Sequence, residues 1–185
     1  MYSGAVLAGG ASRRFGEDKA LFVYRGKPLL LWVLESLRGA EERFIVANRP
    51  YVGFGVPVYP DLLPGADSLS GLHSALAHAR FPWVAVAATD LPFLTRGFWD
   101  FLYEQARASP YPVVAVYNPE GHLEPLMALY HKDCLPQVER QIREGDFRLG
   151  RVVEALGATY VAAKEVVARF GERVYLNANR RADLP

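Results

Sequence analysis

Long and short apolar runs along the chain predict an alternation of strands and helices. The two clearest strands lie in the stretches 3–8 and 82–92 (PWVAVAATDLP), whose nearly continuous apolar residues are typical of strands buried on both faces of a sheet. Shorter runs predict further extended segments, at 21–24, 43–47, 56–59, 113–117, 126–130, 159–162 and 174–176. Strands separated in this way by helical patterns indicate an α/β fold with a mostly parallel sheet.

Apolar residues at helical spacing predict the helices between these strands. They fall at about 28–37, 72–79, 95–108, 132–143 and 149–156. Thr95 is a residue type that caps helix N-termini, and Gly39 is a residue type that ends helices. The later strands are more closely spaced, so we expect an antiparallel part in the sheet, with helices on both faces.

Length and composition indicate a single domain. The chain has 185 residues, 51% of them hydrophobic, which is enough for one sizeable core. A net charge of +1 gives no field that would attract nucleic acid or an acidic membrane, so neither is an expected partner. The single cysteine, Cys134, rules out a disulfide within the chain. Residues 1–9 lack a basic region and no stretch is long enough to span a bilayer, so we expect a cytoplasmic protein.

The first predicted strand runs directly into a glycine-rich, cationic segment (GAVLAGGASRRFGEDKALF). Gly9 and Gly10 allow a ligand to approach backbone N–H groups, and Arg13, Arg14 and Lys19 can add charge-assisted hydrogen bonds. This combination suits a polyphosphate. The spacing matches neither G-x-x-x-x-G-K-[ST] nor G-x-G-x-x-G, so a Walker A loop and a dinucleotide fingerprint are both absent. An ordinary exposed loop with solvated arginines is the alternative.

Asp90 follows the second clear strand, just before Leu91 and Pro92. Ligands of open α/β sheets bind outside the carboxyl ends of the strands, so Asp90 is expected at the same edge as the glycine-rich segment. A carboxylate there can hold Mg²⁺, which usually takes one or two carboxylates together with phosphate oxygens. A turn aspartate is the alternative. A phosphate loop and a metal carboxylate at one edge together indicate a nucleoside triphosphate site.

The same residues carry a resemblance to a known family. Leu7-Ala8-Gly9-Gly10 followed by Arg14, Gly16, Asp18 and Lys19 resembles the L-A-G-G-x-x-x-R-x-G-x-D-K signature of nucleotidyltransferases. The chain looks most like the MobA-like molybdenum cofactor guanylyltransferases, whose later motifs are matched in the same order over nearly the whole chain. The matching segments are Asp61, SLSGL (68–72), TDLP (89–92), EPLMALY (124–130) and YLNANRRADL (175–184).

The resemblance implies both a fold and a reaction. The fold would be a Rossmann-like nucleotidyltransferase domain over 1–185, with a nucleotide-binding part at about 1–95 and an acceptor-binding part at about 96–185. GTP would react with the phosphate of molybdopterin, or of the molybdenum cofactor, to give a guanine dinucleotide cofactor and pyrophosphate. Mg²⁺ would be the cofactor, and proteins that deliver the unstable pterin would be partners.

The resemblance also assigns roles to residues. Lys19, Arg14 and Asp90 would be catalytic, and Asp90 would bind Mg²⁺. Residues expected to bind the nucleotide or the pterin are Leu7, Ala8, Gly9, Gly10, Lys19, Asn48, Asp61, Gly71, Asp90, Asn177 and Asn179, the last two near the pterin. The SLSGL segment that contains Gly71 can line the base or simply start a helix. The chain departs from the family pattern in a short VANR segment around Asn48 and in Glu124, where Gln or His is expected before Pro125.

The expected chemistry needs no covalent enzyme intermediate. The attacking phosphate is already ionised near neutral pH, so positioning and charge stabilisation would supply the catalysis. The histidines are scattered along the sequence and none stands out as a base. Other transfer reactions remain as alternatives. The acceptor would be a sugar 1-phosphate or an isoprenoid precursor phosphate, or a cytidylyl group would be transferred to the same cofactor. A non-catalytic nucleotide-binding regulator is the alternative from another class.

Overall fold

A seven-stranded mixed sheet forms the centre of the computed structural model, which describes residues 1–9 and 17–185. The strand order is β5-β4-β1-β6-β8-β7-β9. The strands are β1 (Ser3–Leu7), β4 (Glu42–Val46), β5 (Val58–Tyr59), β6 (Trp83–Ala88), β7 (Val113–Tyr117), β8 (Leu123–His131) and β9 (Thr159–Val161). The β5-β4-β1-β6 part is parallel, and β8 runs antiparallel to both β6 and β7. The predicted mixed α/β sheet is therefore confirmed.

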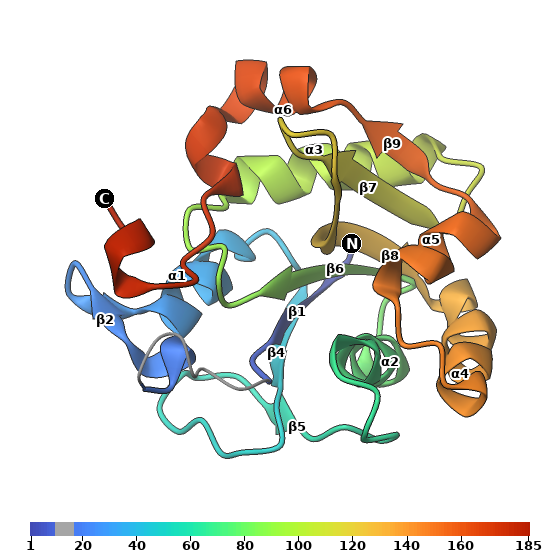
Figure 1. Cartoon of the computed structure of the whole chain (residues 1–185), viewed down its shortest axis with the longest axis horizontal. Coiled ribbons are helices and arrows are strands. Elements are labelled where there is room, and N and C mark those ends of the chain that lie inside the picture. The colour runs from blue at the N-terminus through green and yellow to red at the C-terminus, as the bar shows by residue number, and fades with distance from the viewer. Residues whose placement is uncertain (10–16) are drawn as a thin grey trace.

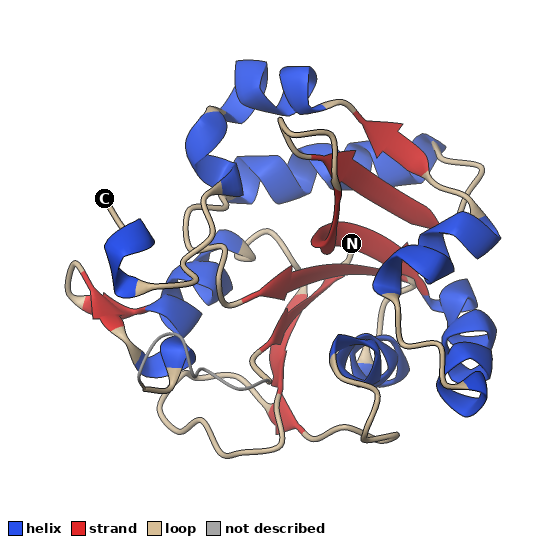
Figure 2. Ribbon diagram, in the orientation of Figure 1, coloured by secondary structure: helices blue, strands red, loops and turns tan. Residues whose placement is uncertain are grey.

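Helices cover both faces of this sheet (Figures 1 and 2). One face carries α1 (Leu29–Ser36), α3 (Arg96–Ala108) and α6 (Ala163–Phe170), and the other carries α2 (Ser68–His78), α4 (Leu135–Glu144) and α5 (Leu149–Leu156). A small hairpin of β2 (Val23–Tyr24) and β3 (Lys27–Pro28) stands apart from the sheet, and single 3₁₀ turns are η1 (Lys19–Leu21), η2 (Lys132–Cys134), η3 (Glu172–Tyr175) and η4 (Arg181–Asp183). Among the described helices, none is long and apolar enough to cross a membrane.

The apolar pattern explains why β1 and β6 lie in the middle. Both faces of each strand are covered, so Ala5, Val6, Ala85 and Val86 are all fully buried. The predicted cap of α3 is present, since the Thr95 hydroxyl accepts a hydrogen bond from Phe98 N at 3.2 Å.

Two expectations from the sequence are wrong in detail, and one helix was missed. The apolar run 174–176 is not a strand: Val174 and Tyr175 belong to the 3₁₀ turn η3, where both are buried. Helix α6 was not predicted, since it is short and buries only Val166 fully. Gly39 does not cap α1, which ends at Ser36; it permits a close approach, because a Cβ there would clash with the Asp100 carboxylate.

The strand directions bring the carboxyl ends of three parallel strands together at one edge of the sheet. The carboxyl ends of β1, β4 and β6 all reach this edge, through Leu7, Val46 and Ala88. Strand β8 arrives from the opposite direction, and its residue Met127 pairs with Ala87. The start of β8 therefore lies beside the end of β6, and residues before Met127 project past the same edge.

Candidate functional site

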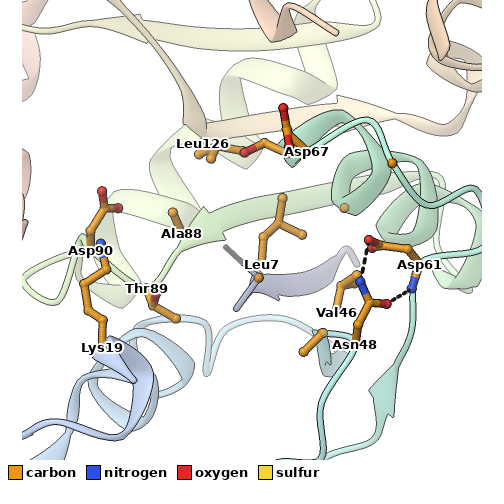
Figure 3. A pocket seen from close by; sticks show the side chains of 15 residues that line it. Leu7, Lys19, Val46, Asn48, Asp61, Asp67, Ala88, Thr89, Asp90 and Leu126 are labelled. Carbon is orange, nitrogen blue, oxygen red and sulfur yellow. Dashed lines mark hydrogen bonds between the residues drawn. The ribbon is translucent and has the colours of Figure 1, made fainter. Parts of the chain in front are cut away.

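A cavity of about 420 Å³ opens at this edge (Figure 3). Its walls come from the ends of β1, β4 and β6, the first turn of α2, the turn η1 and the start of β8. The residues predicted from the sequence that line it are Leu7, Gly9, Lys19, Asn48, Asp61, Gly71 and Asp90. These residues are scattered over the first half of the chain, and the parallel strands bring them together.

A cation and a carboxylate occupy one end of the cavity. Lys19 opens the turn η1, Asp90 follows β6, and Figure 3 shows the Lys19 side chain extending towards Asp90. Burial raises the pKa of the Asp90 carboxyl, and the charge of Lys19 offsets part of that rise. The Asp90 main chain is tied to the C-terminal segment, because its carbonyl accepts a hydrogen bond from Ala178 N at 2.8 Å.

The surroundings of Asp90 suit a metal ion that takes only one carboxylate from the protein. Within residues 1–9 and 17–185, no group of three or more His, Cys, Asp or Glu side chains could hold a metal. Mg²⁺ commonly binds one or two carboxylates and completes its shell with water and substrate phosphates. A partly desolvated carboxylate such as Asp90, whose pKa is raised, gains a counter-charge when such a cation binds.

A reciprocal pair of hydrogen bonds stands at the other end of the cavity. Asn48 Nδ2 donates to Asp61 Oδ2 at 2.8 Å, and Asp61 N donates to Asn48 Oδ1 at 2.8 Å (Figure 3). Asn48 follows β4 and Asp61 follows β5, so the pair joins the ends of two neighbouring strands. Both polar atoms of the Asn48 amide are used in this way, and the amide therefore orients the Asp61 carboxylate.

Helix α2 begins at Ser68, which places the SLSGL segment in its first turns rather than in a loop. Gly71 has a packing role here, because a Cβ at this position would lie 3.0 Å from Leu7 Cδ1. Asp67 precedes the helix with φ 52° and ψ −132°, a conformation that non-glycine residues rarely adopt. It lines the cavity, and the sequence carried no signal for it beyond an aspartate ahead of a helix.

Three of the predicted site residues that the structure describes do not line this cavity. Ala8 is buried beside it, where its N–H donates to Val46 O at 3.0 Å and its carbonyl accepts from Tyr51 Oη at 3.3 Å. Asn177 lines a second cavity and Asn179 is exposed. Gly10 lies outside the described residues. The same is true of the remaining predictions on the glycine-rich segment, which are Arg13, Arg14 and Gly16.

The second cavity, of about 610 Å³, is built by the β7–β8 turn, η3 and the chain that follows η3. Glu124 and Asn118 form its polar wall, with Asn118 Nδ2 donating to Glu124 Oε1 at 2.9 Å. Burial raises the pKa of Glu124, and the nearby charge of Asp90 raises it further, while the Asn118 hydrogen bond opposes both. Glu124 and Leu126 are alternate residues of β8, and Leu126 lines the first cavity, so the two cavities adjoin.

Comparison with known proteins settles the family. A family model described as a MobA-like NTP transferase domain matches residues 4–160. The chain belongs to the MobA-like NTP transferase family. The cavity that holds Lys19 and Asp90 is thus the candidate nucleotide site of a nucleotidyltransferase.

Relatives of this MobA-like protein align over nearly its full length. A probable molybdenum cofactor guanylyltransferase of Deinococcus radiodurans is 39% identical, with 97% of this chain and 90% of the relative covered. A protein of the same description from Thermococcus sibiricus is 34% identical, covering 98% and 94%. The crystal structure of molybdopterin-guanine dinucleotide biosynthesis protein A from Archaeoglobus fulgidus superposes with a TM-score of 0.84 at 27% identity, covering 98% and 94%.

Proposed function

We propose that this MobA-like protein transfers GMP from GTP to the phosphate of molybdopterin or of the molybdenum cofactor, giving the guanine dinucleotide cofactor and pyrophosphate. The observation that carries the proposal is the first cavity. It has a cation and a carboxylate, Lys19 and Asp90, at one end and the Asn48–Asp61 pair at the other. Relatives named as guanylyltransferases support the choice of nucleotide and acceptor.

The Asn48–Asp61 pair is proposed to recognise the base. Guanine presents two adjacent donors, the N1–H and the 2-amino group, and a carboxylate accepts from such a pair. Asn48 holds the Asp61 carboxylate in place, so no side-chain ordering is needed when the base binds. Cytosine presents an acceptor at the corresponding ring nitrogen, which a carboxylate repels.

The Lys19 and Asp90 end is the proposed phosphate site. An oxygen of the acceptor phosphate attacks the α-phosphorus of GTP, a new P–O bond forms, and the bond to pyrophosphate breaks. Lys19 would offset the negative charge that develops on the leaving pyrophosphate, and Asp90 would hold Mg²⁺. When bound, Mg²⁺ supplies Lewis-acid charge stabilisation to the phosphates. Arg14 is proposed to add a further positive charge.

The second cavity is the proposed acceptor site, and all the described residues that line it come from the second half of the chain. It adjoins the Asp90 end of the nucleotide site, which is where the acceptor phosphate must arrive. Glu124 is the proposed contact for the pterin ring, whose N–H and 2-amino donors are adjacent as in guanine. Asn118 holds one carboxylate oxygen of Glu124, as Asn48 holds one of Asp61, and Asn177 lies in the same wall.

Nucleotide selectivity can be tested by thermal unfolding with GTP, CTP, ATP or UTP in the presence of Mg²⁺. GTP at about 100 times its Kd is expected to stabilise the protein by about 2.7 kcal/mol. For a domain of this size that corresponds to a rise of about 5–11 °C in Tm. Asp61→Ala is expected to abolish the preference for GTP, because the donors of guanine lose their acceptor.

Asp133→Ala provides the matched control for that experiment. Its carboxylate lies 3.2 Å from His131 Nδ1 at the opposite end of β8, away from the cavity. This variant should keep the full GTP shift. A larger shift with CTP or UTP would contradict the choice of guanine. Equal shifts with all four nucleotides would support the phosphate site but contradict recognition of the base by Asp61.

The acceptor site can be tested separately by Glu124→Gln. The substitution keeps the size of the side chain but removes the charge that accepts the pterin donors. The KM for the acceptor is expected to rise about 10- to 100-fold, the range for a hydrogen bond to a charged group, while the KM for GTP stays unchanged. Glu104→Gln, on the exposed face of α3, is the control. An equal rise in both KM values would contradict a role in acceptor binding.

A further inference from the structure

A single segment of the chain, 48–51 (Asn-Arg-Pro-Tyr), contacts both ends of the nucleotide cavity. It follows β4 directly. Its first residue, Asn48, binds Asp61 at the proposed base end, as described above. Its other two polar residues, Arg49 and Tyr51, both bind the carboxylate of Asp18, which precedes Lys19 at the phosphate end. Pro50 between them has a fixed φ, which limits the freedom of the segment.

Tyr51 sits at the centre of these contacts. Its side chain is buried, with the residue only 6% exposed, and its ring packs edge-on against Phe54 at a centroid distance of 6.2 Å. Its hydroxyl lies 2.9 Å from Asp18 Oδ2 and 3.3 Å from the Ala8 carbonyl oxygen. Within the glycine-rich segment, Ala8 precedes Gly9 and Gly10, and Asp18 follows Gly16. Tyr51 therefore contacts this segment at two points that are ten residues apart in sequence, Ala8 and Asp18.

The Asp18 carboxylate connects Tyr51 to the turn that contains Lys19. One oxygen, Oδ1, accepts from Ala20 N at 3.2 Å and so caps the turn η1, in which Lys19 is the first residue. The other, Oδ2, lies 2.9 Å from Arg49 Nη1 as well as from the Tyr51 hydroxyl. The Asp18 side chain is only 15% exposed and has partners on three sides, so η1 is held in one orientation.

We propose that Tyr51 is a positioning residue for phosphate binding, acting through Asp18 to fix the turn that presents Lys19 to the cavity. This rests on the proposed function, in which Lys19 binds the nucleotide phosphates. The geometry also links the two ends of the site, since the same segment orients Asp61 through Asn48. Burial raises the pKa of the Tyr51 hydroxyl to about 12, with the hydrogen bond to Asp18 adding to the rise, so the hydroxyl remains a donor throughout the physiological range.

The test uses a probe that depends on neither base nor acceptor, namely inorganic tripolyphosphate with Mg²⁺, measured by titration calorimetry on the full chain. Tyr51→Phe keeps the ring and removes only the hydroxyl. Binding is expected to weaken about 10-fold, the lower end of the range for a hydrogen bond to a charged group. Tyr2→Phe is the matched control, because the Tyr2 hydroxyl donates to Asp100 Oδ1 at 3.0 Å and is buried at the opposite end of β1. It should lower the Tm but leave tripolyphosphate binding unchanged.

A double-mutant cycle separates positioning from general destabilisation. If Tyr51 acts through Lys19, then Tyr51→Phe should weaken binding further by less than twofold, or not at all, once Lys19→Ala is present. Fully additive losses, or normal binding by Tyr51→Phe, would overturn the positioning role while the phosphate site stands. Absence of tripolyphosphate binding by the unmodified protein would instead overturn the proposed phosphate site, and the role of Tyr51 with it. If tripolyphosphate binds but GTP is not preferred, the proposed choice of nucleotide is contradicted, while the positioning role of Tyr51 stands.

Discussion

Asp90→Asn is expected to lower turnover about 10²–10³-fold while the protein stays folded, which is the usual cost of removing one group that stabilises charge in the transition state. Asparagine is nearly isosteric with aspartate, but its neutral amide is a poor ligand for Mg²⁺. Asp90 lies near Lys19 at the proposed phosphate end of the cavity, so the proposed function predicts a direct effect of its loss on the reacting phosphates. Steady-state rates with GTP, acceptor and saturating Mg²⁺ provide the measurement.

The same substitution is expected to leave the Tm unchanged or to raise it. Burial raises the pKa of Asp90 in the folded protein above its value in the unfolded chain. The protonated carboxyl is therefore favoured by folding, and this contribution is fully present below the unfolded pKa and lost as the pH rises through the folded one. Above the folded pKa the ionised carboxylate costs stability, and asparagine removes that cost. Thermal unfolding from pH 4 to pH 8 should show a smaller loss of stability in the variant.

Asp133→Asn serves as the control for both measurements, because Asp133 is exposed at the far end of β8. It should keep normal turnover. Full activity of Asp90→Asn with saturating Mg²⁺ would rule out the proposed role of Asp90. A large fall in its Tm would indicate instead that the carboxylate has a structural function.

Lys19→Ala is expected to reduce turnover by a similar factor, about 10²–10³, and to weaken nucleotide binding as well. The lysine is proposed to contact the phosphates both before and during the reaction, so both KM and kcat should change. Asp18 and η1 fix its backbone, and the loss of the side chain should not disturb that turn.

Lys27→Ala is the matched control for this lysine. Lys27 lies in the nearby β2–β3 hairpin, where its ammonium pairs with Glu35 and lies 4.1 Å from the centroid of the Trp32 ring. It should retain normal kinetics even if its Tm falls. An equal loss of turnover in the two lysine variants would show that positive charge near the hairpin, rather than Lys19 itself, supports the reaction.

Much of the fold follows from apolar patterning alone. Strands β1 and β6 are buried on both faces, and their continuous apolar runs marked them clearly. Helix α5 was predicted at its observed bounds because its apolar face is regular. The pattern failed where a short apolar run has no strand partner, as at Val174, or where a helix has little buried surface, as in α6. Burial by itself does not tell a strand from a packed turn.

The site was predicted less completely than the fold, for a physical reason. Gly9, Lys19 and Asp90 lie directly after strands or in a recognisable motif, and the sheet topology brought them together as expected. Tyr51 and Asp67 carry no such local signal. Tyr51 is connected to the site by a hydrogen bond to Asp18, and Asp67 lines the cavity in a rare backbone conformation. The second cavity likewise depends on how η3 packs beside the β7–β8 turn. Such contacts appear only when distant segments meet.

The reversed direction of β8 places the wall of the proposed acceptor site in a later part of the chain than most of the first cavity. The turn from Asn118 to His122 closes through the hydrogen bond from Asn118 N to His122 O, and it forms part of the second cavity. It follows in sequence all the residues that line the first cavity except Leu126. Glu124, two residues after the turn, interacts electrostatically with Asp90. Under the proposed function, we expect a graft of this one hairpin turn to change the phosphorylated acceptor, while the strands that line the first cavity keep their register.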